Sequence, residues 1–283
     1  MTPSPVPSHR DISWCRLPFL ATLGLVVLLG TGSLQGCAGG AAATASAAQN
    51  EPVTESDEPE ARKRARLRLE LASSYFENGQ TTVALDEIKQ SLAADPAYPA
   101  AHVLRGLVYM RLNDARLAED SFRRALSFNA RDADALHNYG WLLCNQKRYS
   151  ESLQMFDGAL SNPTYGGRAK TLMLKATCQL RMGSPADAES SFSRAYELDP
   201  ANPYVGFNLA SLEFQRGDLT RSQFVIRRIN NSDLANAETL WLGIKIERKL
   251  GNREAVEQLA QQLSRRFPKS RELASYQRGA FDE

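Results

Sequence analysis

Few side chains in this chain of 283 residues could bind a metal ion or act as a nucleophile. The cysteines and histidines are Cys15, Cys37, Cys144, Cys178, His9, His102 and His137. His102 and His137 are not accompanied by cysteines or carboxylates at metal-ligand spacing. There is also no glycine-rich phosphate loop and no nucleophile elbow. The sequence therefore predicts a non-enzymatic protein with no catalytic residue, metal or cofactor, and it assigns His102 and His137 to packing or to a binding groove.

The N-terminal residues have the layout of a secretory signal peptide. Two arginines precede an apolar run at residues 17–30, which is too short to cross a bilayer comfortably and ends in small residues. The next segment, LQGC at residues 34–37, resembles the lipobox of bacterial lipoproteins, although Gln35 departs from the small or apolar residue usual there. The resemblance implies cleavage after residue 36 and acylation of Cys37. The alternative is an ordinary secretory signal with a chance cysteine near its end.

Acylation of Cys37 would set the location of the protein. Each buried methylene contributes about 0.8 kcal/mol, so three acyl chains would hold a soluble domain on a bilayer. Ala38 stands where, in bacterial lipoproteins, an aspartate commonly causes retention at the inner membrane. The implied destination is therefore the periplasmic face of the outer membrane. Cys15 would leave with the signal peptide, so Cys144 and Cys178 would remain in an oxidising compartment, where disulfides persist.

The overall composition excludes several classes of protein. The 34 Lys and Arg residues nearly balance the 32 Asp and Glu residues, and the net charge of +2 is too small for a dedicated nucleic-acid binder. Hydrophobic residues make up 43% of the chain and charged residues 23%. These ordinary values argue against wholesale disorder, collagen and a polytopic membrane protein.

Residues 37–63 are predicted to be a flexible linker. Small, polar and then acidic residues dominate this segment, and they offer almost no large apolar side chain to offset the entropy of ordering. Five cations follow the acidic residues: Arg62, Lys63, Arg64, Arg66 and Arg68. They indicate either a basic patch beside anionic lipid head groups or a solvated first helix whose cations balance the acidic linker. The apolar pattern that begins at Leu67, Leu69 and Leu71 favours the solvated helix.

The remainder of the chain is repetitive. Small residues recur at Ala72, Gly106 and Gly140, 34 residues apart, and after a two-residue insertion at Ala176 and Ala210. Glycines fall at the expected turns and prolines at the expected joins. This spacing resembles the tetratricopeptide repeat, a helix–turn–helix unit of 34 residues. The resemblance implies an all-α, right-handed superhelical solenoid over residues 64–283, with units at about 65–98, 99–132, 133–166, 169–202, 203–236 and 237–270 and a capping helix at 271–280.

In tetratricopeptide repeats, the first helix of each unit (the A helix) lines a concave groove that holds a peptide or a partner protein. By this resemblance, positions 2, 5, 9, 12 and 13 of each A helix face the groove. The residues predicted to line it are Leu69, Phe76, Val103, Leu107, Met110, Arg111, His137, Trp141, Met173, Tyr204, Phe207 and Phe214. The alternative for any one of them is burial under neighbouring helices.

The repeat resemblance also relates the two remaining cysteines. Cys144 and Cys178 fall on the A helices of the third and fourth units, which are neighbours in a solenoid. We therefore expect a disulfide between these units. The alternative is a pair of buried free thiols.

A more specific resemblance rests on the lipobox, the six repeats and three stretches of sequence. The stretches are HNYGWLLC at residues 137–144, RAYELDPANP at 194–203 and WLG at 241–243. Together they resemble the PilF/PilW family, outer-membrane lipoproteins of type IV pilus biogenesis. The resemblance implies a pilotin, which binds the pilus secretin or another pilus assembly protein and assists insertion and multimerisation of the secretin. The alternative function is a general periplasmic scaffold that recruits cell-wall or outer-membrane assembly proteins.

Overall fold

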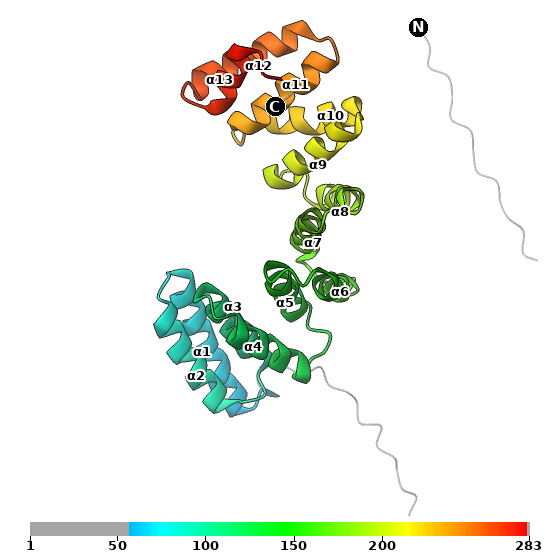
Figure 1. The fold of residues 1–283 in the computed structure, drawn as a ribbon. Coiled ribbons are helices and arrows are strands. Elements are labelled where there is room, and N and C mark those ends of the chain that lie inside the picture. Colours follow the sequence, from blue (N-terminus) through cyan, green and yellow to red (C-terminus); the bar gives the residue numbers. More distant parts are fainter. Residues whose placement is uncertain (1–56, 282–283) are drawn as a thin grey trace, which may run out of the picture. The chain divides into compact units, whose positions relative to one another are not determined.

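The structure, a computed structural model, describes residues 57–281. All regular elements in this part of the chain are helices, drawn in Figure 1. They are α1 (Glu60–Glu77), α2 (Thr81–Ala94), α3 (Pro99–Arg111), α4 (Ala115–Phe128), α5 (Ala133–Asn145), α6 (Tyr149–Leu160), α7 (Arg168–Met182), α8 (Pro185–Leu198), α9 (Pro203–Arg216), α10 (Leu219–Asn230), α11 (Ala237–Lys249), α12 (Arg253–Arg266) and α13 (Arg271–Arg278). The predicted signal peptide, Cys37 and most of the predicted linker lie outside the described residues.

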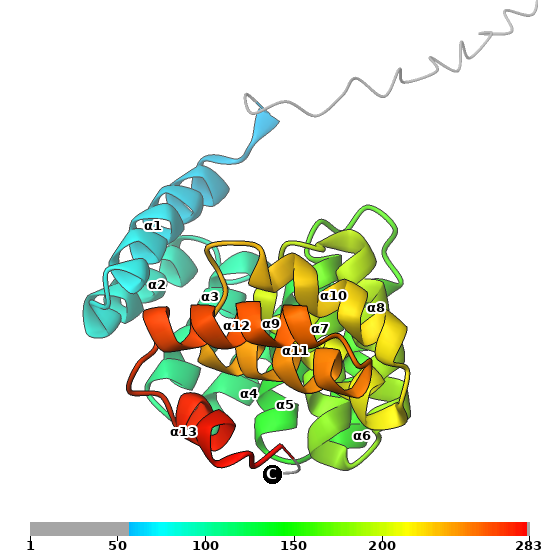
Figure 2. The same cartoon turned by 90° about the horizontal axis from the view of Figure 1, so that it is seen from above.

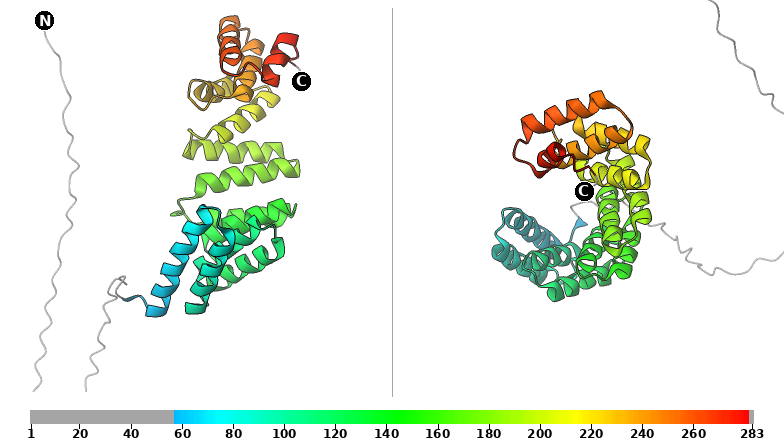
Figure 3. Two further views of the ribbon diagram at one scale, coloured as in Figure 1. Left: turned by 90° about the vertical axis from the view of Figure 1, so that its left-hand side faces the viewer. Right: turned by 45° about the horizontal axis from the view of Figure 1, so that its top comes forward.

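The first twelve helices form six consecutive helix–turn–helix pairs, and each pair packs against the next. Figure 3 shows the pairs stacked in chain order. Most successive A helices, such as α1 and α3 or α3 and α5, pack against each other, whereas successive second helices (B helices) do not pack closely in the described part of the chain. The A helices therefore form the inner face of the stack. The last helix, α13, packs against α11 and α12 (Figure 2). This arrangement confirms the predicted all-α solenoid of six units and a capping helix.

Close contact between the two helices of a unit depends on one small residue facing one large residue. Gly106 on α3 faces Phe122 on α4, and Gly140 on α5 faces Phe156 on α6. A Cβ atom on Gly106 would lie 2.5 Å from the ring of Phe122, and one on Gly140 would lie 2.9 Å from the ring of Phe156. Both rings are fully buried. The recurring small residue is therefore required by this steric contact, which lets the helices approach closely enough to bury the ring.

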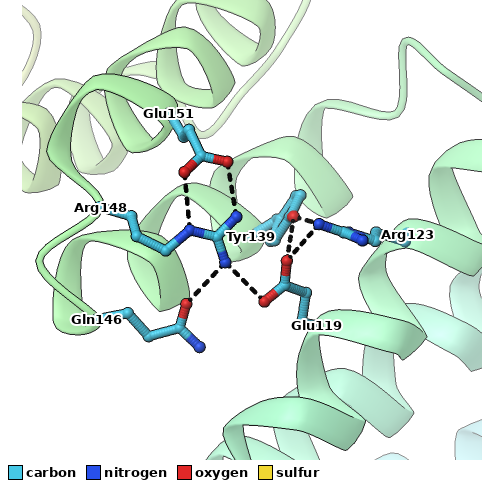
Figure 4. A network of polar contacts seen from close by, with 6 residues as sticks. All are labelled: Glu119, Arg123, Tyr139, Gln146, Arg148 and Glu151. Carbon is cyan, nitrogen blue, oxygen red and sulfur yellow. Dashed lines mark hydrogen bonds and ion pairs between the residues drawn. The ribbon is translucent and has the colours of Figure 1, made fainter.

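A polar network joins the second and third units (Figure 4). Glu119 on α4 accepts hydrogen bonds from the Tyr139 hydroxyl at 2.9 Å and from Arg148 at 2.8 Å. Arg148 also donates two hydrogen bonds to Glu151, at 2.8 and 2.6 Å. Burial by itself raises the pKa of Glu119, but the hydrogen bonds from Arg148 and Tyr139, with the charge of Arg123, hold it below its ordinary value. The carboxylate of Glu119 therefore stays ionised and links α4 to both helices of the next unit.

The start of the solenoid differs from the prediction. The first helix begins at Glu60, so the end predicted for the linker at residue 63 is corrected to residue 59. Pro59 occupies the N-cap position with its fixed φ, and the carboxylate of Glu60 is favourable in the first turn. Both features allow the helix to begin before the apolar pattern does.

Most of the predicted cationic cluster pairs with carboxylates of the chain itself. Arg62 pairs with Asp95, Arg66 with Glu58 and Glu70, and Arg68 with Glu87. The other two cations, Lys63 and Arg64, are exposed. These contacts support the interpretation of a solvated first helix.

The turn between the two helices of each unit contains one residue with a left-handed backbone conformation. This residue is the fifteenth of its unit when the units are counted from residues 65, 99, 133, 169, 203 and 237, and we call its place repeat position 15. Four units place glycine there, namely Gly79, Gly183, Gly217 and Gly251, with φ between +76° and +87°. Units two and three instead have Asn113, with φ +59°, and Lys147, with φ +62°. A left-handed backbone is unfavourable for a lysine, whereas asparagine tolerates it better. Lys147 is therefore a strained position in an otherwise glycine-based pattern.

Replacement of Lys147 by glycine should stabilise the protein. We expect Lys147→Gly to raise the free energy of unfolding by about 0.5–1 kcal/mol, because the strain at positive φ exceeds the entropy that glycine loses on folding. Asn113→Gly should give about half this gain or less. The measurement is urea unfolding followed by circular dichroism. Lys147→Ala is the control, since it removes the same exposed side chain and keeps the strain; an equal gain in this variant would contradict the explanation.

Candidate protein-binding groove

The residues predicted to line the groove come from five A helices, α1, α3, α5, α7 and α9. All but two of them keep exposed or partly exposed surface. Tyr204 is the most open of the apolar ones, with 46% of its surface exposed. The A-helix face is thus accessible along the stack, which is the minimum requirement for a binding surface.

Val103 and His137 are corrections to the prediction, because neighbouring helices cover them. Val103 is 9% exposed and packs with Phe122 and Tyr139. His137 is 4% exposed and hydrogen-bonds through Nδ1 to the Thr171 hydroxyl, at 2.7 Å. Both positions face the next A helix rather than the groove.

Both described histidines have packing roles. Burial lowers the pKa of His137 to about 4, with a smaller contribution from the charge of Lys170. Burial also lowers the pKa of His102, whose Nε2 donates to the Pro96 carbonyl at 2.9 Å. His102 stacks on the ring of Phe128. Two neutral, buried imidazoles stabilise the solenoid and have no access to a substrate.

Aromatic side chains at the groove are covered by cations from the following unit. In three pairs the cation stands at repeat position 13 of an A helix, 3.7–4.8 Å from the centroid of a ring in the preceding unit. Such contacts contribute about 0.5–1 kcal/mol at exposed sites. The groove surface is therefore cationic over its aromatic rings and less apolar than predicted. The pairs are Arg111 with Phe76, Arg181 with Trp141 and Lys249 with Phe214.

The C-terminal end of the groove holds a cleft of about 800 Å³ between α9, α11 and α13. Phe207 and Phe214 line it with partly exposed rings, and Trp241, which is only 9% exposed, lines its wall. Arg271 also lines it and pairs with Glu238 and Glu272 at 3.3 and 2.6 Å. We refer to this feature as the C-terminal cleft. Its size suits one or two large side chains of a partner.

The sequence prediction missed the groove residues of the sixth unit. Positions 2, 5, 9, 12 and 13 of α11 are Glu238, Trp241, Lys245, Arg248 and Lys249. The first three line the C-terminal cleft, and the last two line a smaller cavity beside it with Phe281. The same repeat positions that identified Arg111 would have found them. The prediction stopped at the fifth unit because the sixth is less regular in its small and large residues.

Cys144 on α5 and Cys178 on α7 form a disulfide in the structure, with their Cα atoms 5.8 Å apart. Both are almost completely buried and pack with Phe156. The bond joins the A helices of the third and fourth units, on either side of the two-residue insertion. It therefore braces the one join at which the repeat spacing is irregular.

Within residues 57–281, no group of three or more histidine, cysteine or carboxylate side chains is placed to hold a metal ion. In the same residues no helix is both long and apolar enough to cross a bilayer.

Comparison with known proteins agrees with this geometry. The tetratricopeptide repeat family matches residues 69–132, 103–166 and 173–222. The type IV pilus assembly protein PilF of Pseudomonas aeruginosa is 28% identical over 89% of this chain and 96% of its own length. PilW, described as a widely conserved type IV pilus biogenesis factor, has a crystal structure that resembles this chain with a TM-score of 0.63 and 30% sequence identity. The match covers 75% of this chain and 97% of the PilW chain. This chain belongs to the PilF/PilW family of tetratricopeptide-repeat proteins. The structure of Pseudomonas aeruginosa PilF matches with a TM-score of 0.70 over 78% of this chain.

In this PilF/PilW protein, the glutamates at repeat position 11 of the fifth and sixth units are buried in contrasting surroundings. Glu247 on α11 accepts hydrogen bonds from Arg227 at 2.7 Å, Gln223 at 2.8 Å and Asn252 at 3.1 Å. Glu213 on α9 has only Arg221, at 3.4 Å, and its Oε2 atom accepts no hydrogen bond from a described residue. Both side chains are 1% exposed. Burial raises the pKa of Glu213 to about 7, with Arg221 opposing the shift.

Neutralising these two glutamates in the PilF/PilW protein should have opposite effects. A carboxyl group whose pKa is higher in the folded than in the unfolded state stabilises folding at low pH, and this contribution is lost as the pH rises from about 4.5 to about 7. Glu213→Gln should therefore raise stability at pH 8, on the order of 2 kcal/mol, and have little effect at pH 5. Glu247→Gln should lower stability by about 2 kcal/mol, because it places an amide donor against three donors. Urea unfolding at several pH values tests both; a gain for Glu213→Gln that does not depend on pH would contradict the assignment.

The disulfide should contribute to the stability of the PilF/PilW protein. Closing a loop with a sequence separation of 34 residues stabilises by about 3–4 kcal/mol in the chain-entropy treatment, so reductant should lower the free energy of unfolding by about that amount. The double variant Cys144→Ser, Cys178→Ser should be insensitive to reductant. The direct measurement is intact mass after alkylation of the mature, denatured protein without reductant. Labelling of both cysteines under these conditions would show that they are free thiols.

Proposed function

We propose that this protein is a non-enzymatic lipoprotein of type IV pilus biogenesis that binds the pilus secretin through its A-helix groove and assists its outer-membrane localisation and multimerisation. The observation that carries the proposal is the match to Pseudomonas aeruginosa PilF, a type IV pilus assembly protein, over 96% of that protein's length. The likeness to PilW, a type IV pilus biogenesis factor, supports it independently through the fold.

Binding of a protein partner is supported by the chemistry of the groove. Groove aromatics and cations are residue types that dominate binding energy at protein interfaces. The C-terminal cleft offers a place where a partner side chain could be buried between Phe207, Phe214 and Trp241.

Membrane attachment is supported by the lipobox-like residues 34–37, with Cys37 as the acylated residue. Residues between Cys37 and α1 would serve as a tether from the outer membrane to the solenoid. A partner bound in the groove would thereby be carried to the same membrane. The lipid anchor and the binding surface belong to one chain, so a secretin bound in the groove is held close to the outer membrane.

Deletion of the protein tests the proposed function. We expect loss of SDS-resistant secretin multimers in the outer membrane and loss of twitching motility, since unassembled secretin gives the pilus no exit. Immunoblotting of unheated membrane samples measures the multimers, and re-expression of the wild-type chain is the control. Normal multimers and normal pili in the deletion strain would exclude a pilotin role and favour the general periplasmic scaffold.

The anchor is tested separately with Cys37→Ser. The variant should keep the thermal unfolding of the wild-type solenoid and leave the outer-membrane fraction, because the residue precedes the first described helix in the sequence and only its acyl chains would hold the domain on the bilayer. Fractionation and circular dichroism measure the two properties. Cys15→Ser is the matched control and should leave fractionation unchanged; recovery of Cys37→Ser in the outer membrane would refute lipid anchoring at this residue.

A further inference from the structure

We propose that the partner segment held in the groove is acidic and extended, with carboxylates that pair with Arg111, Arg181 and Lys249 and an apolar side chain that enters the C-terminal cleft. This inference rests on the part of the proposed function that assigns the groove to a protein partner, and it goes further by naming the partner's chemistry. We call the three cations the groove ladder.

The groove ladder follows the repeat. Position 13 of the A helix carries a cation in the second, fourth and sixth units and an uncharged amide in the third and fifth, Asn145 and Gln215. Each ladder cation lies over an aromatic ring of the unit before it, at 3.7, 4.8 and 4.6 Å from the centroid. The same charge is therefore presented on the same face at every second unit.

The ladder cations have no carboxylate partner among the described residues. Arg111 donates to the Phe76 carbonyl, and Arg181 donates to the Asn145 side chain at 2.9 Å. Nearby cations outside the ladder behave differently, since Arg216 pairs with Glu189 and Asp218, and Arg148 pairs with Glu119 and Glu151. The chain thus neutralises those nearby cations and leaves the three ladder cations on the groove face without a carboxylate partner among the described residues.

The aromatic rings beneath the ladder cations order their side chains in a position to bind carboxylates. An aromatic face holds one side of a guanidinium or ammonium group and leaves its charge intact, so the remaining donors point away from the ring. A side chain that is already ordered loses less conformational entropy when it pairs. Each ladder position is thereby a prepared site for one carboxylate of the partner.

The position of the ladder favours an extended protein segment over a membrane or a compact domain. Its cations stand on α3, α7 and α11, so one partner must pass along the A-helix face from the second unit to the sixth. A flat bilayer meets the outer surface of a solenoid more easily than its inner face. An extended chain can follow the inner face and present a carboxylate at each step.

The C-terminal cleft supplies the apolar contact. Lys249 covers the ring of Phe214 at the edge of the C-terminal cleft. Lys249 also lines the smaller cavity beside the cleft, together with Arg248 and Lys245. The partly exposed ring of Phe207 lines the cleft beyond them, beside the largely buried Trp241. A partner that uses this end therefore needs acidic residues next to an aromatic or branched aliphatic side chain.

The test uses the full chain purified in detergent and a fluorescein-labelled synthetic peptide. In this probe aspartates alternate with serines and one phenylalanine stands near an end. Fluorescence anisotropy should show binding that weakens with salt. The triple variant Arg111→Gln, Arg181→Gln, Lys249→Gln should weaken it by about tenfold, the combined effect of three exposed ion pairs. The matched control, Arg131→Gln, Arg253→Gln, Lys269→Gln, removes three exposed and unpaired cations elsewhere in the described chain and should change affinity by less than about twofold.

A second measurement leaves the protein unchanged. Replacing the probe's phenylalanine by serine should weaken binding to the wild-type chain severalfold, because the C-terminal cleft loses its occupant. This result does not depend on the folding of any variant. Equal binding of the two probes would overturn the cleft assignment.

The remaining outcomes also decide the proposal. Failure of the wild type to bind the acidic probe, or equal losses in the two triple variants, would overturn it. In a further outcome, the triple ladder variant keeps its affinity for the peptide and loses binding to phosphatidylglycerol vesicles. That result would assign the ladder to a membrane surface. The probe contains no secretin sequence, so peptide binding is independent of the secretin. Normal secretin multimers in a deletion strain would therefore refute the proposed pilotin function without contradicting the binding of acidic peptides by the groove ladder.

Discussion

The contact between a small residue on one helix and a large buried side chain on the next is the constraint on which the other features of this solenoid depend. Where Gly106 meets Phe122, there is no room for even one additional carbon atom. This closeness sets the distance between the two helices of a unit and hence the angle at which the next unit stacks. No single unit encloses a core of its own, so stability comes from burying rings between helices and from stacking unit on unit.

Stacking assigns different tasks to the two faces of an A helix. Residues that face the next helix are removed from water, and polar ones then require partners; Glu247, with three donors, meets this requirement and Glu213 does not. Residues on the opposite face of the A helices form the groove. Binding surface and structural core therefore alternate along the same helices, and a shift of one position changes a partner contact into a packing contact.

The groove of this protein is not the bare apolar surface that its residue types suggest. Phe76, Trp141 and Phe214 each lie under a cation from the following unit. The covering reduces the apolar area that the free protein shows to water, which lowers its tendency to associate non-specifically. A partner that approaches the groove therefore contacts the positive charges of these cations before it contacts the aromatic rings. The family relationship points to pilus assembly, and the cations narrow the chemistry of the segment that would be recognised.

The sequence by itself determined the number of units, their bounds to within a few residues, the glycine turns at position 15 and the placement of two cysteines on adjacent A helices. These features follow from local spacing, because each unit repeats the same contact between its own two helices. Only the tertiary structure decided that Val103 and His137 are buried, that α1 begins at Glu60 and that a cleft lies between α9, α11 and α13. Exposure depends on the helices contributed by neighbouring units and by the cap, and the pattern within one unit carries no information about how closely its neighbours approach.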